Sequence, residues 1–227
     1  MVTTGRANPP ARVPAGRDTA PSVVVLGCGA LARELLALLA PLPGVAVTCL
    51  PASLHNRPER IPDAVRAGIA RAREEHGPDV RVVVGYADCG TGGMLDTALA
   101  GTGVERLAGA HCYEIYAGRA AFEALSDEEP GTFYLTDFLA RQFDSLVWQG
   151  LKLDRHPQLL PQLFGNYRRL VYLAQSDDPA LDARARDAAD RLGLEFERRS
   201  TGISGLGDAL AASGVETGVD RGPAAGG

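Results

Sequence analysis

The sequence contains no apolar run long enough to cross a membrane. The longest candidate, around residues 35–40, is interrupted by Pro41 and Pro43, whereas a membrane-spanning helix needs about 20 consecutive apolar residues. Positive charge is not in excess either, because the formal net charge is -5 at pH 7. A phosphate backbone requires a basic surface. The sequence therefore predicts neither a membrane nor a nucleic-acid partner.

The N-terminal segment lacks the apolar stretch of a signal peptide, and the chain contains no C-x-x-C pair. We expect residues 1–20 and 213–227, which are rich in Pro and Gly, to be disordered tails around a folded region of residues 21–212. Without an export signal we expect a cytoplasmic location, where thiols stay reduced. The chain has four cysteines, which are then available for catalysis or metal binding: Cys28, Cys49, Cys89 and Cys112.

Short apolar runs alternate with amphipathic helical patterns throughout residues 21–212. This alternation is typical of βαβ units and of a mainly parallel sheet. We therefore predict an α/β fold of Rossmann-like form, with open, mainly parallel sheets, helices on both faces, and two similar lobes at residues 21–125 and 126–212. Strands are expected at residues 23–26, 45–50, 81–86, 106–109, 169–174 and 194–198. Residues 132–147 space their apolar side chains as an amphipathic helix does.

A glycine-containing loop, GCGALA, follows the first predicted strand. Its spacing fits the G-x-G-x-x-G/A pattern, in which glycines such as Gly27 and Gly29 let a pyrophosphate approach a helix N-terminus. The acidic residue that binds a ribose hydroxyl about 20 positions later is missing, because the second strand ends at Thr48, Cys49 and Leu50. A tight strand-to-helix turn without any ligand explains these glycines equally well.

The loop GYADCGTGG follows the third predicted strand and combines an acid, a thiol and glycines. Gly90, Gly92 and Gly93 free the backbone to form a concave row of N–H donors, and a helix is expected directly after them. Both features favour a thiolate, so Cys89 is a candidate nucleophile or soft metal ligand. Asp88 beside it is a candidate acid or orienting carboxylate. The structural alternative is a glycine turn that happens to contain a cysteine.

Other candidate side chains also follow predicted strands. The motif HCYE offers an imidazole, a thiol and a carboxylate at His111, Cys112 and Glu114, and His55 follows the second strand. Open parallel sheets bind their ligands at the carboxyl ends of the strands. Because all four cysteines follow or close a predicted strand, we expect several of them to share one site.

Three functions agree with these motifs, each with a small molecule as partner and with a homo-oligomer as a compatible assembly. The leading interpretation is a metal ion, such as zinc, or an iron–sulfur cluster held by thiolates and imidazoles. The candidate ligands are Cys28, Cys89, His111, Cys112 and His55. The candidate catalytic groups are Asp88, Cys89 and Glu114.

The second function is a metal-free thiol enzyme, in which Cys89 attacks an electrophilic carbon and His55 or His111 accepts the proton. The third is a module that binds an anionic ligand or cofactor in its glycine loops. The candidate residues for this binding are Gly27, Gly29, Gly90, Gly92, Gly93, Thr201 and Gly202.

Several longer motifs carry a resemblance to a known family: CGALAREL, CLPASLHNRPERIP, GYADCGTGG, HCYEIYAG, EEPGTFYLTDFLARQFD, GLKLDRHPQL and FGNYRRLVYLAQ. Over residues 22–212 they resemble the bacterial and archaeal family catalogued as domain of unknown function 1638. The resemblance implies no defined activity and no catalytic residue. It does imply a context, since members resemble accessory proteins found among genes for corrinoid-dependent methyltransferases and one-carbon metabolism. We therefore expect a role on a small molecule in that metabolism.

Overall fold

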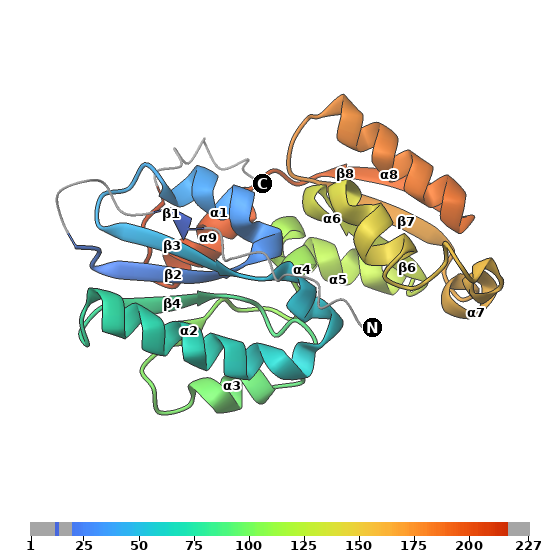
Figure 1. Cartoon of the computed structure of the whole chain (residues 1–227). Helices are drawn as coiled ribbons and strands as arrows, with labels where there is room; N and C mark the ends of the chain where they lie inside the picture. Colours follow the sequence, from blue (N-terminus) through green and yellow to red (C-terminus); the bar gives the residue numbers. More distant parts are fainter. Residues whose placement is uncertain (1–11, 14–19, 218–227) are drawn as a thin grey trace. The chain divides into compact units, whose positions relative to one another are not determined.

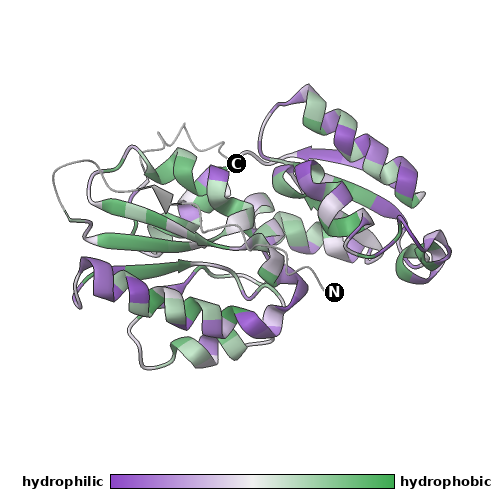
Figure 2. Cartoon of the chain, viewed as in Figure 1, coloured by the Kyte–Doolittle hydropathy of each residue, from purple (hydrophilic) through white to green (hydrophobic). Residues whose placement is uncertain are grey.

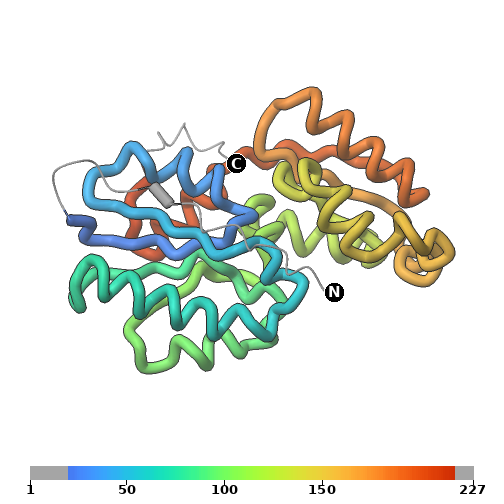
Figure 3. The backbone as a smooth tube through the Cα atoms, in the orientation of Figure 1, coloured from blue at the N-terminus to red at the C-terminus, as the bar shows by residue number. Residues whose placement is uncertain are grey.

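The computed structural model describes residues 12–13 and 20–217, which fold into two α/β units (Figure 1). The first unit contains residues up to 111 and those from 206 onward, and the second unit contains residues 112–205. The backbone therefore leaves the first unit once and comes back to it in its last helix (Figure 3). No helix of the described residues is long and apolar enough to cross a membrane.

The first unit is built on a five-stranded sheet in the order β1-β3-β2-β4-β5. Its strands are β1 (Arg12–Val13), β2 (Val23–Cys28), β3 (Val45–Leu50), β4 (Arg81–Gly85) and β5 (Glu105–Arg106). Strands β2 to β5 pair in parallel, whereas β1 pairs antiparallel with β3 at the edge. The valine-rich strands β2, β3 and β4 are mostly hydrophobic, as a sheet covered on both faces requires (Figure 2).

Helices cover both faces of this sheet (Figure 1). They are α1 (Ala32–Leu39), α2 (Ile61–His76), α3 (Met94–Leu99) and α9 (Ser204–Ala212), with short 3-10 turns η1 (Gly29–Leu31), η2 (Ala52–Asn56) and η3 (Pro58–Arg60). α1 packs over Gly27, where an added Cβ would collide with Leu35. α2 packs on the opposite face, because its Gly68 lies against Leu26 and neighbouring strand residues point to opposite faces.

The second unit contains a three-stranded parallel sheet in the order β6-β7-β8. Its strands are β6 (Thr132–Thr136), β7 (Arg169–Ala174) and β8 (Glu195–Ser200). Its helices are α4 (Cys112–Ala117), α5 (Arg119–Glu128), α6 (Asp137–Gln142), the π-helix η4 (Phe143–Trp148), the 3-10 turn η5 (Pro157–Leu159), α7 (Leu160–Phe164) and α8 (Pro179–Leu192).

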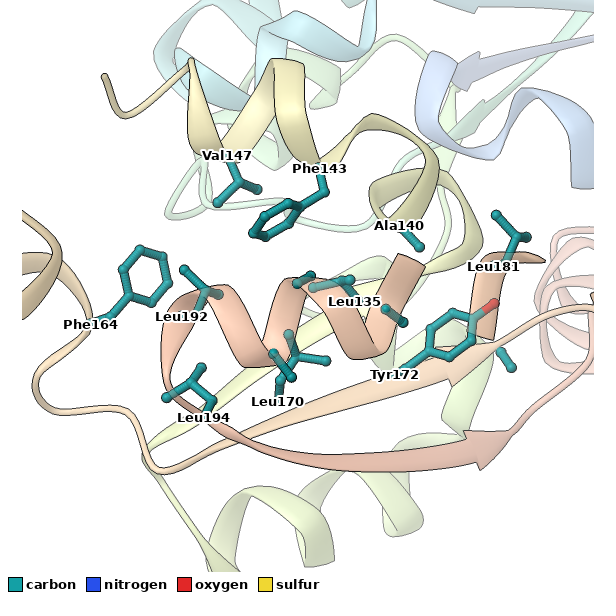
Figure 4. Packing of buried hydrophobic residues seen from close by; sticks show 14 of the residues in the cluster. Leu135, Ala140, Phe143, Val147, Phe164, Leu170, Tyr172, Leu181, Leu192 and Leu194 are labelled. Carbon is teal, nitrogen blue, oxygen red and sulfur yellow. The ribbon is translucent and has the colours of Figure 1, made fainter. Parts of the chain in front are cut away.

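The main core of the second unit lies between its sheet and the helices α6, η4 and α8 (Figure 4). Phe143, Tyr172 and Leu192 are among its buried side chains. A smaller apolar cluster joins Val171 of β7 to Leu125 of α5 on the other face. This sheet is therefore also covered on both faces, which explains why β7 is buried from Leu170 to Ala174.

The predicted fold class is confirmed, since the protein is α/β with two parallel sheets of open, Rossmann-like form. The single helix predicted for residues 132–147 is wrong, because these residues form β6 followed directly by α6 and η4. No glycine or proline marks the junction. Instead Thr136 ends the strand, and its hydroxyl accepts a hydrogen bond from the Leu139 N–H and caps α6.

The boundaries of the two units differ from those of the predicted lobes. The division falls after residue 111 rather than at residue 125, and most of α9 belongs to the first unit. The predicted tails lie mainly outside the described residues, but residues 12–13 pair with β3. Beyond α9, the carbonyls of Ser213 and Gly214 accept hydrogen bonds from Arg81. These bonds attach the end of α9 to the first sheet.

Candidate functional site

The carboxyl ends of β2, β3 and β4 meet at one edge of the first sheet. Among these parallel strands β2 comes first in the chain, and β3 and β4 lie on either side of it. The connections that leave β2 and β3 therefore run to opposite sides of β2. Open parallel sheets bind their ligands at the carboxyl ends of strands where the strand order reverses in this way. Cys28 is the last residue of β2, and Tyr86 lies beside it directly after β4, because Gly27 pairs with Gly85.

The Cys28 side chain is buried at the carboxyl end of β2. The residue is 2% exposed, and its Sγ accepts a hydrogen bond of 3.3 Å from the Ala30 N–H at the start of η1. The same sulfur lies 3.6 Å from Nδ1 of His55. Burial raises the pKa of the Cys28 thiol to about 11, although its contacts with Ala30 and Tyr86 oppose the shift. Cys28 is therefore a protonated thiol at neutral pH.

His55 lies on η2, which follows the carboxyl end of β3. Its Nδ1 is 3.2 Å from the carbonyl oxygen of Ala52. A carbonyl can only accept a hydrogen bond, so we assign the proton of the neutral imidazole to Nδ1 and the lone pair to Nε2. The ring stacks on Tyr86, with centroids 6.3 Å apart and planes 14° apart. These contacts fix both the tautomer and the orientation of the imidazole.

Cys89 is half-buried and has a left-handed backbone conformation, with φ 51°. Few residues other than glycine adopt this conformation. The N–H groups of Asp88 and Cys89 donate to carbonyls of residues 109 and 110 at 3.0 and 2.8 Å, which holds the loop beside the segment that follows β5. The Cys89 side chain is one of the neighbours that raise the pKa of His55.

The neighbours of His55 change the pKa of its imidazole. Burial lowers the pKa, but the hydrogen bond and the charge of Cys89, together with the Ala52 carbonyl, raise it above the ordinary value of 6.5. The neighbouring Cys89 therefore favours the protonated form of the His55 imidazole. An imidazole near a partly exposed thiol can activate a cysteine nucleophile by accepting its proton.

Tyr86 completes the site and was not among the residues selected from the sequence. It is 0% exposed, and its hydroxyl has no hydrogen-bond acceptor among the described residues. Burial and the neighbouring thiols of Cys28, Cys89 and Cys49 raise the pKa of Tyr86 far above its usual value. The hydroxyl therefore stays protonated and keeps a hydrogen-bond donor available. Its place in the sequence, as a polar aromatic residue shortly after the valine run of β4, could have identified it as a candidate.

Asp88 stabilises the loop rather than the thiol. Its carboxylate accepts hydrogen bonds from Oγ1 of Thr91 at 2.6 Å and from the N–H groups of Gly92 and Gly93 at 3.0 and 2.9 Å. Burial raises the pKa of Asp88, but these bonds and the nearby Arg106 guanidinium lower it below its usual value. The predicted N–H donors of these two glycines are present, and the chain's own carboxylate binds them.

The other predicted glycine loops are also filled by the chain itself. A Cβ added to Gly29 would lie 2.8 Å from the Leu50 carbonyl oxygen, so this glycine lets η1 pack on the end of β3. In the second unit, the N–H groups of Thr201 and Gly202 both donate to the Ala174 carbonyl, at 2.9 and 3.1 Å. These loops close strand ends, and their geometry gives no support to an anion cradle.

The predicted metal ligands are divided between the two units. The first unit contains Cys28, His55, Cys89 and His111. The second unit begins with α4, which carries Cys112 and the candidate acid Glu114. Within residues 12–13 and 20–217, no group of three or more His, Cys, Asp or Glu side chains could hold a metal ion. Two of the candidate residues do lie together, since Sγ of Cys28 is 3.6 Å from Nδ1 of His55, and the ring of Tyr86 stacks on this imidazole.

A protein family described as "Protein of unknown function (DUF1638)" matches residues 49–210. The chain belongs to this family. The DUF1638 match begins at Cys49 and contains His55, Tyr86 and Cys89, whereas Cys28 lies before it. The family resemblance inferred from the motifs is thereby confirmed. Searches of curated proteins and of solved structures found no match.

Proposed function

We propose that the first unit acts on an electrophilic small molecule through Cys89, with His55 as the proton acceptor. The observation that carries this proposal is the placement of His55. Its Nδ1 lies 3.2 Å from the Ala52 carbonyl oxygen, its ring stacks on Tyr86, and Cys89 is a neighbour that raises its pKa. A neutral imidazole held in one tautomer beside a half-buried thiol is equipped to take the proton of that thiol.

In the proposed reaction, Nε2 of His55 takes the proton from Sγ of Cys89, and the thiolate attacks the electrophilic centre of the substrate. A bond forms to Sγ, and the leaving group departs with the electron pair of the bond that breaks. The imidazolium then gives its proton to the leaving group. Stacking on Tyr86 holds the ring in place, which reduces the freedom that must be lost during the reaction.

The geometry favours this function over the two others predicted from the sequence. An anion-binding module needs free N–H donors, but those of Gly92 and Gly93 bind Asp88. A zinc ion or an iron–sulfur cluster needs about three or four protein ligands, and the part of the chain that the structure describes offers no such group. The corrinoid or one-carbon context, the cytoplasmic location and a homo-oligomer stay predictions.

Alkylation of Cys89 by iodoacetamide, followed by peptide mass mapping over a range of pH, tests the proposal. We expect Cys89, a half-buried thiol, to be alkylated at neutral pH with the help of His55 as proton acceptor. His55→Gln should lower the rate at neutral pH by about tenfold or more, because it removes the proton acceptor. His156→Gln is the matched control, since it changes an exposed histidine of the second unit. It should leave the rate unchanged.

Equal pH profiles for wild-type protein and His55→Gln would remove His55 from the reaction and overturn the proposal. Protection of Cys89 in freshly purified protein, lifted by a chelator, would support metal ligation instead. Circular dichroism of each variant establishes that a change in rate does not come from unfolding.

A further inference from the structure

We propose that Cys28 is a positioning residue for His55, whose sulfur accepts the Nδ1 proton of the imidazole and leaves Nε2 as the nitrogen that takes up a proton. This inference rests on the proposed function for its purpose, because it supplies the orienting group that a thiol–imidazole pair needs. Its geometric basis is the contact between Sγ of Cys28 and Nδ1 of His55, which are 3.6 Å apart.

The direction of this hydrogen bond follows from the second neighbour of Nδ1. A thiol can either donate its proton to a nitrogen lone pair or accept a proton from an N–H group. The Ala52 carbonyl oxygen, 3.2 Å from Nδ1, can only accept, so Nδ1 carries the proton. The Cys28 sulfur is therefore the acceptor, and the Nδ1–H of His55 is shared between Sγ and the Ala52 oxygen.

The buried end of β2 and a backbone donor hold this sulfur in place. Cys28 is the last residue of β2 and is 2% exposed, and its Sγ also accepts the Ala30 N–H at 3.3 Å. His55, by contrast, is exposed on η2. The contact therefore ties an exposed side chain to the buried end of the sheet and restricts the rotamers that the imidazole can adopt.

A neutral thiol suits this role because it orients the ring without charging it. Burial raises the pKa of Cys28 to about 11, so its sulfur brings no negative charge to the imidazole at neutral pH. An ionised carboxylate in the same place would favour the imidazolium, in which Nε2 already carries a proton. Cys28 therefore holds His55 in the tautomer that can act as a proton acceptor.

The loop that carries Cys89 contacts the segment of His55 on both sides of the cysteine. Before the cysteine, the Tyr86 ring stacks on the imidazole, with centroids 6.3 Å apart. After it, Gly90 lies against Pro58 of η3, since a Cβ added to this glycine would be 3.8 Å from the proline Cβ. The oriented imidazole therefore lies on the segment that packs against the loop of the proposed nucleophile.

The test observes the imidazole directly, by ¹⁵N NMR of the full-length protein labelled at histidine, with His55→Gln to assign the signals. In wild-type protein the neutral ring should carry its proton on Nδ1. Cys28→Ala should lower the ratio of the Nδ1–H form to the Nε2–H form by about two- to tenfold, because one hydrogen bond is lost. Cys28→Ser keeps an acceptor and should stay close to wild type. Cys49→Ala is the matched control, since it removes a buried thiol from the neighbouring strand β3.

A proton on Nε2 in wild-type protein, or equal ratios in wild-type protein and Cys28→Ala, would overturn the role given to Cys28. Equal losses in Cys28→Ala and Cys28→Ser would overturn it as well, because the acceptor would then not matter.

Iodoacetamide labelling of Cys89 separates this inference from the proposed function. Cys28→Ala should slow the labelling several-fold, because less of His55 has a free Nε2, and Cys28→Ser should restore the rate. If Cys28→Ala changes the tautomer while neither it nor His55→Gln changes the labelling, Cys28 is still a positioning residue for His55. The proposed function is then the part that fails.

Discussion

Asp88 accepts a 2.9 Å hydrogen bond from the backbone N–H of Gly93, the N-cap residue directly before α3. Successive N–H groups of this kind form a concave site for anions. Here the carboxylate of the same loop occupies it, so the loop is already stabilised without a ligand. The group that this loop leaves available for chemistry is the thiol of Cys89.

Asp88→Asn should destabilise the first unit. The amide offers a single acceptor oxygen and cannot keep the bonds from Thr91, Gly92 and Gly93, so we expect the free energy of unfolding to fall by about 1–2 kcal/mol. The folded-state pKa of Asp88 is lowered. Its contribution is therefore present above the unfolded pKa of about 3.9 and is lost as pH falls through the folded pKa. Urea unfolding at neutral and acid pH measures both effects.

The control for this prediction is Asp63→Asn, which changes an exposed carboxylate of α2 whose bond to Arg66 lies at the surface. Its effect on unfolding should stay within a few tenths of a kcal/mol. A deficit of the Asp88 variant that is as large at acid pH as at neutral pH would contradict the role given to the ionised carboxylate.

Gly27→Ala distinguishes a glycine needed for packing from one needed for a ligand. The new Cβ would collide with Leu35 of α1, so we expect a loss of about 1–3 kcal/mol of stability. Leu35→Ala alone leaves a cavity and should cost about 2–5 kcal/mol. In the double variant the new methyl has room, so the combined loss should be smaller than the sum. Strictly additive losses in urea unfolding would show that the two residues are not coupled.

Tyr172→Phe should destabilise the second unit. The Tyr172 hydroxyl donates a 2.7 Å hydrogen bond to Oδ1 of Asp137, a carboxylate that is 2% exposed. Its removal leaves a buried charged acceptor with one partner fewer, and we expect a loss of about 1.5–3 kcal/mol. Tyr134→Phe is the matched control, because its hydroxyl contacts Ser126 at 3.3 Å in a partly buried position. If thermal unfolding shows equal losses of stability for the two variants, the hydrogen bond to Asp137 does not stabilise the protein more than a partly buried surface bond.

Much of the fold was predictable because valine runs bounded by glycine leave few alternatives to buried parallel strands. The same reasoning placed Cys28 and Cys89 at one edge of the sheet. The strand β6 was missed for a local reason. Thr136 caps α6 without any glycine or proline before it. The apolar residues of the strand and the helix therefore follow each other without a break and resemble the pattern of a single amphipathic helix.

The candidate site was predictable only in part. The sequence left His55 and His111 as alternative bases for Cys89, because the choice depends on how η2 folds back over Tyr86. The role of Asp88 depends on a turn that aims two glycine N–H groups at its own carboxylate. The Tyr86 hydroxyl lacks a hydrogen-bond partner because of how the surrounding side chains pack in three dimensions. The order of residue types in the sequence does not predict this.

The most direct test of the central claim is an NMR titration of His55 in wild-type protein and in Cys89→Ser. We expect the neutral ring to carry its proton on Nδ1, and we expect a pKa above the ordinary 6.5 in wild-type protein. The pKa should be lower in Cys89→Ser, because serine does not ionise and cannot stabilise the imidazolium. A His55 that titrates at or below 6.5 in wild-type protein, or at the same pH in both proteins, would show that His55 and Cys89 are not coupled.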